Sequence, residues 1–211
     1  MRTLWRRLGI AALLLPAALP AAAPKDRGPD KYQTLLARLK QGDRTVDFLE
    51  IRRAYADSPQ YTGGYDTDES KAMFSALRKG DFTETLKLSK KILENNYLDI
   101  DAHQAAYLAN KQLHIEAEAD FHHYISHGLI DAILQSGDCK TQETACEVLS
   151  THEEYIVLQI LGLRPNKQSL VHSGKHSYDV LEAVNPKTQE KVTFYFNIDK
   201  PLGYLNRIFS K

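Results

Sequence analysis

The chain has 211 residues, a length that suggests one domain, and its 27 basic residues balance its 27 acidic ones. The sequence holds no basic cluster large enough to bind a phosphate backbone, which disfavours a nucleic-acid partner. It also contains neither a G-x-S-x-G nucleophile elbow nor a glycine-rich phosphate loop. These features favour a protein that is not an enzyme over a serine hydrolase or a nucleotide-dependent enzyme.

Residues 1–23 have the pattern of a signal peptide, in which three arginines precede an apolar run that ends in small residues. The run, about 16 residues long, is shorter than the roughly 20 that a membrane-spanning helix needs, and it contains Pro16 and Pro20. We therefore expect cleavage near Ala23 and a protein that is periplasmic or secreted, with an uncleaved membrane anchor as the alternative. Without the leader, 24 basic residues face 27 acidic ones, and no later run is long enough to span a membrane. A soluble mature protein is expected.

After a polar linker at 24–29, apolar residues recur every three or four positions, which predicts amphipathic helices. The expected helices are, in order, 31–40, 47–56, 69–78, 82–93, one capped by Asp99 or Asp101 and running to Leu113, 115–136 with a bend near Gly128, and 142–161. Between 69 and 113, a Gly-Asp turn and an Asn-x-x-Asp-x-x-Ala break are typical of a tetratricopeptide-like helix hairpin. Only one such unit is present, so we expect a short helical layer and not a solenoid.

The pattern changes after Gly162, where short segments rich in Val, Tyr and Phe predict strands. The expected strands are 169–171, 178–184 and 192–198, with a hairpin loop at 185–190 and a short final helix at 202–209. The predicted fold class is α+β, mainly α, with a helical-hairpin layer and a small C-terminal antiparallel β-hairpin or three-stranded sheet. Residues 30–211 are expected to form a single domain with a helical part at 30–162 and a β part at 163–211.

The chain has two cysteines, Cys139 and Cys146, which are seven residues apart. A closely spaced pair in an exported protein most simply forms a disulfide, and two reduced thiols are the alternative. Thr141 is the expected N-cap of the helix at 142–161, so the bridge would join the preceding turn to the second turn of that helix.

The order of short motifs along the chain resembles a family of exported bacterial proteins, the domain of unknown function 4919. The motifs are Gly42-Asp43, Asp47-Phe48 with Arg52 and Tyr55, Ser58-Pro59-x-Tyr61, Asp101-Ala102-His103, Ser136-Gly137-Asp138, Glu143-Thr144-Ala145, Glu153-Glu154-Tyr155 and Phe194-Tyr195-Phe196. The resemblance spans roughly residues 32–198 and implies fold and export, but no activity. The chain departs from the family pattern at Cys139 and Cys146, where a glycine and an aromatic residue are expected.

Three histidines, His122, His123 and His127, lie close together in the predicted helix at 115–136. His123 and His127 are four residues apart and therefore on one helix face, where two imidazoles can share a metal ion. A third ligand would have to come from His103, His152 or Glu153. The sequence favours the alternative, histidines on a polar helix face, so no cofactor is predicted.

A second group of candidates has the residue types that bind polar ligands: Asp47, Arg52, Tyr55, Tyr61, Asp101 and His103. A carboxylate, a guanidinium, phenols and an imidazole can together line a polar cleft. The alternative is structural, with an Asp N-cap, a paired arginine and core tyrosines.

Two hypotheses about function remain. The first is a non-enzymatic periplasmic module that binds a protein or peptide partner through the helical layer at 69–113. The second is a small-ligand binder or hydrolase whose cleft is formed by Asp47, Arg52, Tyr55 and His103, and it requires these side chains to converge on one pocket.

Overall fold

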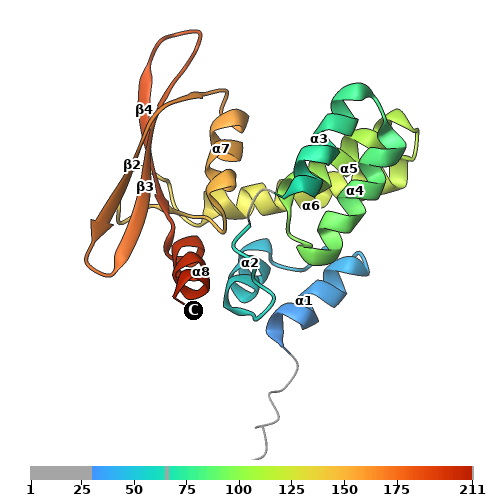
Figure 1. The fold of residues 1–211 in the computed structure, drawn as a ribbon, viewed down its shortest axis with the longest axis horizontal. Helices are drawn as coiled ribbons and strands as arrows, with labels where there is room; N and C mark the ends of the chain where they lie inside the picture. The colour runs from blue at the N-terminus through green and yellow to red at the C-terminus, as the bar shows by residue number, and fades with distance from the viewer. Residues whose placement is uncertain (1–29, 65–66, 211) are drawn as a thin grey trace, which may run out of the picture.

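The computed structural model describes residues 30–64 and 67–210, so the predicted signal peptide at 1–23 and linker at 24–29 lie outside the described residues. Within this part of the chain, six helices come first, and a four-stranded sheet with two more helices follows (Figure 1). The predicted class, α+β and mainly α, is confirmed.

Each of the first five helices begins within one residue of the start that the sequence predicts. They are α1 (Lys31–Lys40), α2 (Phe48–Asp57), α3 (Asp68–Lys79), α4 (Phe82–Asn95) and α5 (Ile100–Gln112). A side-chain oxygen caps every one by accepting a hydrogen bond from a backbone N–H of the first turn. The caps are Asp30, Asp47, Thr67, Asp81 and Asp99. Between the two candidate caps of α5, the structure therefore selects Asp99.

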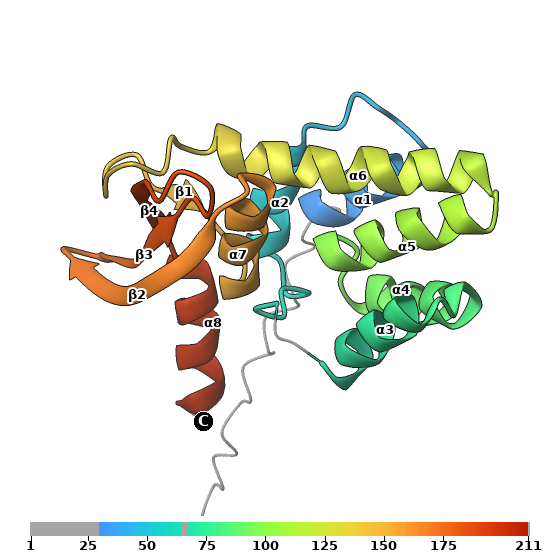
Figure 2. The same ribbon diagram turned by 90° about the horizontal axis from the view of Figure 1, so that it is seen from above.

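Helices α3 to α6 form the helical layer, in which each helix packs on the next (Figure 2). Met73, Ile92, Leu93, Ala102 and Ala105 are the buried residues that hold α3, α4 and α5 together. The two alanines are at most 1% exposed, and their small side chains let the helices approach closely. Helices α3 and α4 therefore form a packed pair.

Helix α6 (Glu116–Gln135) is a single 20-residue helix that runs from the helical layer to the sheet (Figures 1 and 2). The sequence analysis expected a bend at Gly128. The structure shows another role for this glycine: a Cβ placed there would lie 2.2 Å from Cε2 of Phe48, so only glycine lets α2 pack this closely on α6.

The sheet has the strand order β1-β4-β3-β2. Its strands are β1 (Cys146–Glu147), β2 (Arg164–Ser173), β3 (His176–Val184) and β4 (Lys191–Asn197). The three predicted strands are present and antiparallel, although β2 is longer than expected at both ends. β1 is a fourth strand that the sequence analysis did not predict, and it pairs with β4 in parallel. The sheet is therefore mixed.

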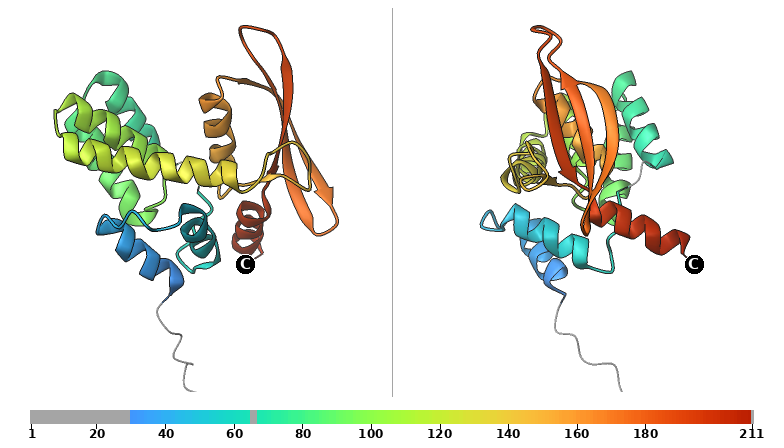
Figure 3. Two further views of the ribbon diagram at one scale, coloured as in Figure 1. Left: turned by 180° about the vertical axis from the view of Figure 1, so that it is seen from behind. Right: turned by 90° about the vertical axis from the view of Figure 1, so that its left-hand side faces the viewer.

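Helix α7 (Thr151–Ile160) lies on the face of the sheet that is turned toward the helical layer, whereas the other face carries no described helix (Figures 1 and 3). α8 (Asp199–Phe209) follows β4 directly and extends the predicted final helix by three residues at its start. No helix in the described ranges combines the length and apolarity needed to cross a bilayer.

The predicted helix at 142–161 is wrong in its first half. Residues 142–150 form a turn and β1, and α7 begins only after Ser150, whose hydroxyl accepts a hydrogen bond from the backbone N–H of Glu153. The physical reason is that the backbone of this segment bonds elsewhere. The carbonyl of Thr144 accepts from the N–H of Cys139, and Cys146 and Glu147 pair with β4, so these residues are not available to a helix.

Candidate functional site

A buried ion pair joins α2 to the start of α7. Arg52 Nη1 donates to Glu153 Oε1 at 2.7 Å, and Nη2 donates to Oε2 at 2.9 Å. Nη2 also donates to the backbone carbonyl of Glu147, and Glu153 Oε2 accepts from the N–H of Leu149. Both side chains are buried, so their charges are compensated by each other and by backbone dipoles. Arg52 thus joins α2, β1 and α7.

A polar cleft lies directly beside this pair, between the start of α5 and the start of α7. Three of the predicted residues line it, namely Tyr55, Tyr61 and Asp101. Asp99 and His152 line it as well, and His152 Nε2 forms an ion pair with Asp101 Oδ2. The phenol of Tyr61 donates to the carbonyl of Leu149 at 2.6 Å, which ties the loop after α2 to the segment before α7.

The titratable residues of the cleft are three carboxyl groups, two phenols and one imidazole. The pKa of Asp99 is raised to about 6, mainly by burial and also by Asp101 and Glu153, whereas the N–H of Ala102 and the side chain of His152 act to lower it. Burial also raises the pKa of Tyr55, so its phenol stays neutral at physiological pH. The cleft encloses only about 40 Å³, far less than the roughly 300–1,000 Å³ of typical ligand sites. It has room for water or one small polar group.

The other three predicted residues, Asp47, Arg52 and His103, do not line this cleft, so the four side chains of the second hypothesis do not converge here. Asp47 caps α2 at the surface, where its carboxylate accepts from the N–H of Glu50. His103 is two positions after Asp101 on α5, and side chains two apart on a helix point about 200° apart. Arg52 does not line the cleft and contacts it only through Glu153.

His103 belongs instead to a cluster on the opposite side of α5. It is fully buried, its Nε2 lies 2.8 Å from the carbonyl oxygen of Tyr97, and its Nδ1 lies 2.8 Å from Nδ1 of His122. His122 in turn lines a groove that crosses α4, α5 and α6. The predicted functional residues therefore divide between two places in the fold.

The groove, which we call the helical-layer groove, has an apolar floor and a charged rim. The floor is formed by Leu86, Leu93, Tyr97, Ala106 and Phe121, and the rim carries Lys40, Lys90, Glu94 and Glu118. It encloses about 430 Å³, within the usual range for ligand and peptide side-chain sites.

His123 and His127 are exposed neighbours on α6, with ring centroids 4.1 Å apart, and His123 also packs on Tyr107. Among the described residues, no three His, Cys, Asp or Glu side chains come together in a way that could hold a metal ion. The proposed third ligands are engaged elsewhere, since His152 pairs with Asp101 and Glu153 with Arg52. A metal at His123 and His127 stays a prediction that rests on two residues.

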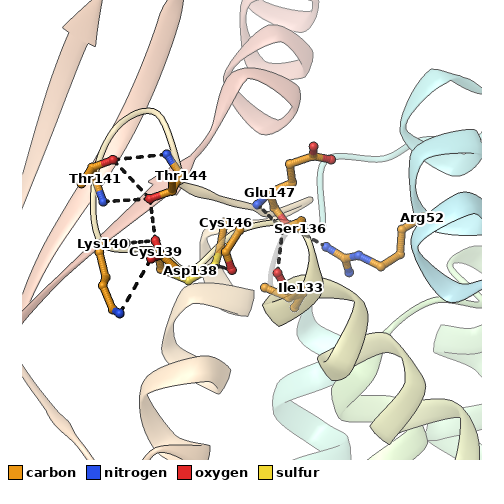
Figure 4. Close-up of a disulfide and its surroundings, with 11 residues drawn as sticks. Arg52, Ile133, Ser136, Asp138, Cys139, Lys140, Thr141, Thr144, Cys146 and Glu147 are labelled. Atoms are coloured by element: carbon orange, nitrogen blue, oxygen red, sulfur yellow. Dashed lines mark hydrogen bonds and ion pairs between the residues drawn. A yellow bond between two sulfur atoms is a disulfide. The ribbon is translucent and has the colours of Figure 1, made fainter.

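Cys139 and Cys146 form a disulfide, as predicted (Figure 4). The bridge joins the loop after α6 to β1, and not to a helix as expected. The loop is fixed further because Cys139 donates its N–H to the carbonyl of Thr144 and accepts from the N–H of Tyr195 on β4. Thr141, the expected N-cap, bonds Thr144 within this turn. The disulfide therefore positions Glu147, whose carbonyl accepts from Arg52.

A second buried acid, Glu154, lies between α7 and the sheet. Glu154 is 0% exposed, and neither of its carboxyl oxygens accepts a hydrogen bond from any described residue. Burial, with a smaller contribution from the adjacent Asp179 on β3, raises the pKa of Glu154 to about 9. Glu154 is therefore protonated at neutral pH, in a position to donate to Asp179, which accepts from Gln168 on its other side. The two adjacent glutamates are thus both buried, Glu153 in an ion pair with Arg52 and Glu154 beside Asp179.

Comparison with known proteins identifies the family and nothing finer. The family model for the domain of unknown function (DUF4919) matches residues 25–207, and the chain belongs to this family. No curated protein and no solved structure matches the chain. The resemblance of α3 and α4 to a tetratricopeptide hairpin is not supported by any match and stays a prediction.

Proposed function

We propose that this DUF4919 protein is an exported, non-enzymatic module that binds a protein or peptide segment in the helical-layer groove. The observation that supports it is the groove itself, an apolar floor assembled from three successive helices and open to solvent. Such a surface leaves apolar side chains such as Leu86 and Phe121 incompletely covered, which favours a partner that buries them.

The shape and chemistry of the groove suit a peptide better than a compact metabolite. Its floor is formed by residues of α4, α5 and α6, so an amphipathic segment that lies across these helices can place its apolar side chains along the groove. Its charges lie at the rim, where they remain hydrated and set the orientation of a partner. The rigid packing of the helices beneath lowers the conformational entropy lost on binding.

A selection experiment tests this function. A displayed peptide library is selected on the wild-type protein without its leader, and the recovered peptides are measured against Leu86→Asp and Leu108→Asp. Leu86 lines the groove, whereas Leu108, on α5, is 46% exposed and lies outside it. We expect Leu86→Asp to weaken binding at least tenfold and Leu108→Asp to leave it unchanged. Peptides that bind both variants as well as wild type would show that the groove is not the site.

Export is the second part of the proposal. It is supported by the disulfide, because such bridges form and persist in oxidising compartments, and by the signal-like sequence of residues 1–23. N-terminal sequencing of protein recovered from a periplasmic or culture fraction should give a start near residue 24. Recovery of the full-length chain in the membrane fraction would contradict it and favour an anchor.

The polar cleft supports a second candidate function, the binding of one small polar group. The specific observation is that Asp99, Asp101 and His152 meet there, with Tyr55 and Tyr61 closing its sides. The carboxyl groups of Asp99 and Asp101 favour a small cation such as methylammonium. Titration of methylammonium followed by nuclear magnetic resonance should shift the His152 signals of wild type but not of Asp101→Asn. No shift below about 100 mM would remove this candidate.

A further inference from the structure

The hydrogen bonds of His103 determine where its proton lies. Its Nε2 faces the backbone carbonyl of Tyr97 at 2.8 Å, and a carbonyl oxygen can only accept. Nε2 therefore carries the hydrogen. Burial lowers the pKa of His103 to about 3, with a further lowering by His122, so the ring stays neutral and its Nδ1 has only a lone pair.

The tautomer of His103 in turn determines that of His122. Its Nδ1 lies 2.8 Å from the bare Nδ1 of His103, and a contact this short between two ring nitrogens requires one hydrogen between them. His122 must supply it. Burial lowers the pKa of His122 as well and outweighs the raising effect of Glu118, which keeps the ring neutral at pH 7. Nε2 of His122 is then a fixed hydrogen-bond acceptor.

This acceptor remains open to a partner. Among the described residues, the side chain of His122 makes one hydrogen bond, to His103, so its Nε2 has no partner. Within the same residues, the buried side-chain oxygens and nitrogens without a partner all belong to Glu154, so Nε2 of His122 is not one of the buried atoms. Nε2 of His122 is thus accessible, and its ring lies beside the apolar floor next to Phe121. The groove combines apolar contact area with this oriented lone pair, and the polar side chains of Ser89 and Asn110 line it as well.

The charges around the groove select the kind of donor. Two lysines and two glutamates, Lys40, Lys90, Glu94 and Glu118, line the groove, so their formal charges sum to zero. An ionic donor would also lose its hydration against the apolar floor, which disfavours it strongly. The complementary group is a neutral N–H donor on a large apolar body. Among side chains, the indole of tryptophan has this combination and accepts no hydrogen bond.

We propose that His122 is the specificity-determining residue of the helical-layer groove and selects a tryptophan indole through a hydrogen bond to Nε2. This inference rests on the proposed peptide-binding function and states which side chain the bound segment inserts. His103 and the carbonyl of Tyr97 act as positioning groups that fix the tautomer of His122.

The test compares indole with 1-methylindole, which has nearly the same apolar body and no N–H. Each is titrated into the wild-type protein without its leader, and backbone amide shifts on α4, α5 and α6 report binding. We expect indole to bind the groove about three- to tenfold more tightly than 1-methylindole, the range of a single hydrogen bond. The ¹⁵N shift of His122 Nε2 should be that of an unprotonated nitrogen and should move only with indole.

Variants separate the inference from the function on which it rests. His122→Phe should abolish the preference for indole, although it leaves His103 without its partner and can lower stability, so the wild-type comparison decides. Leu86→Asp should weaken both ligands, and Leu108→Asp neither. Equal binding of both ligands in the groove would overturn the role of His122 and leave peptide binding standing. The absence of any groove shift with either ligand would overturn both.

Discussion

Glu153 and Glu154 are neighbours on α7, both are buried, and the structure treats them in opposite ways. Adjacent helix positions are about 100° apart, so Glu153 faces α2 and Glu154 faces the sheet. On the α2 side, Arg52 supplies a matching charge and two hydrogen bonds. On the sheet side there is another acid, Asp179, and the pKa of Glu154 rises to about 9. Burial alone therefore does not set the charge of a carboxyl group; the partner on the facing layer does.

The largest effect is expected when the paired side is broken. Arg52→Met leaves Glu153 as an unpaired buried charge and should lower the free energy of unfolding by about 3–5 kcal/mol, measured by urea denaturation. The matched control is Arg53→Met, because Arg53 pairs with Glu147 at the surface, where its side chain is 54% exposed. That change should cost less than about 1 kcal/mol. Equal losses for the two variants would show that the buried pair has no special role.

Removal of the disulfide should weaken the loop beside the Arg52–Glu153 pair while Glu153 and Glu154 stay in place. Replacing Cys139 and Cys146 together by Ser should lower the free energy of unfolding by about 2–3 kcal/mol, because the unfolded chain gains the freedom of a short loop. The dependence of stability on pH should keep its shape, since Glu154 is untouched. A reducing agent that left the urea midpoint of wild type unchanged would contradict this prediction.

A substitution of Glu154, on the sheet side, should raise the free energy of unfolding instead of lowering it. Between its ordinary pKa of 4.5 and its folded value of about 9, Glu154 keeps a proton that the unfolded chain loses, so stability falls as the pH rises. Glu154→Gln keeps the shape and an N–H donor for Asp179 without needing that proton. We expect it to exceed wild type by roughly 2 kcal/mol at neutral pH, with the advantage shrinking as the pH falls toward about 5.

The same substitution one position earlier is the control for this prediction. Glu153→Gln removes the charge that Arg52 requires and should destabilise the protein at neutral pH. Urea midpoints of both variants, measured at several pH values, check the difference in sign. If both substitutions destabilise equally at neutral pH, Glu154 is not held in its neutral form.

Much of the helical half could be predicted because its signals are local. Apolar residues every three or four positions and a capping Asp or Thr define α1 to α5 in the sequence itself. The start of α7 had a local signal too, the Ser-x-x-Glu pattern at 150–153, but apolar residues from 145 onward suggested an earlier start. β1 had none, because two residues become a strand only through pairing with Phe196 and Asn197.

The candidate site was predicted only in part, for a related reason. Tyr55, Tyr61 and Asp101 have residue types that suit a polar cleft, and they do line one. Their neighbours Asp99 and His152 come from the beginnings of two helices that meet only in the folded chain. His103 was assigned to the wrong place because its partners, Tyr97 and His122, lie on segments whose packing no spacing rule gives.

The bond between Arg52 and Glu153 spans 101 residues of sequence, and this separation bears on how the chain reaches its native state. Contacts so distant along the chain are closed late and slow the folding of a domain. During synthesis, α1 and α2 emerge before α7, so the guanidinium of Arg52 has no counter-ion until the last third of the chain has been made.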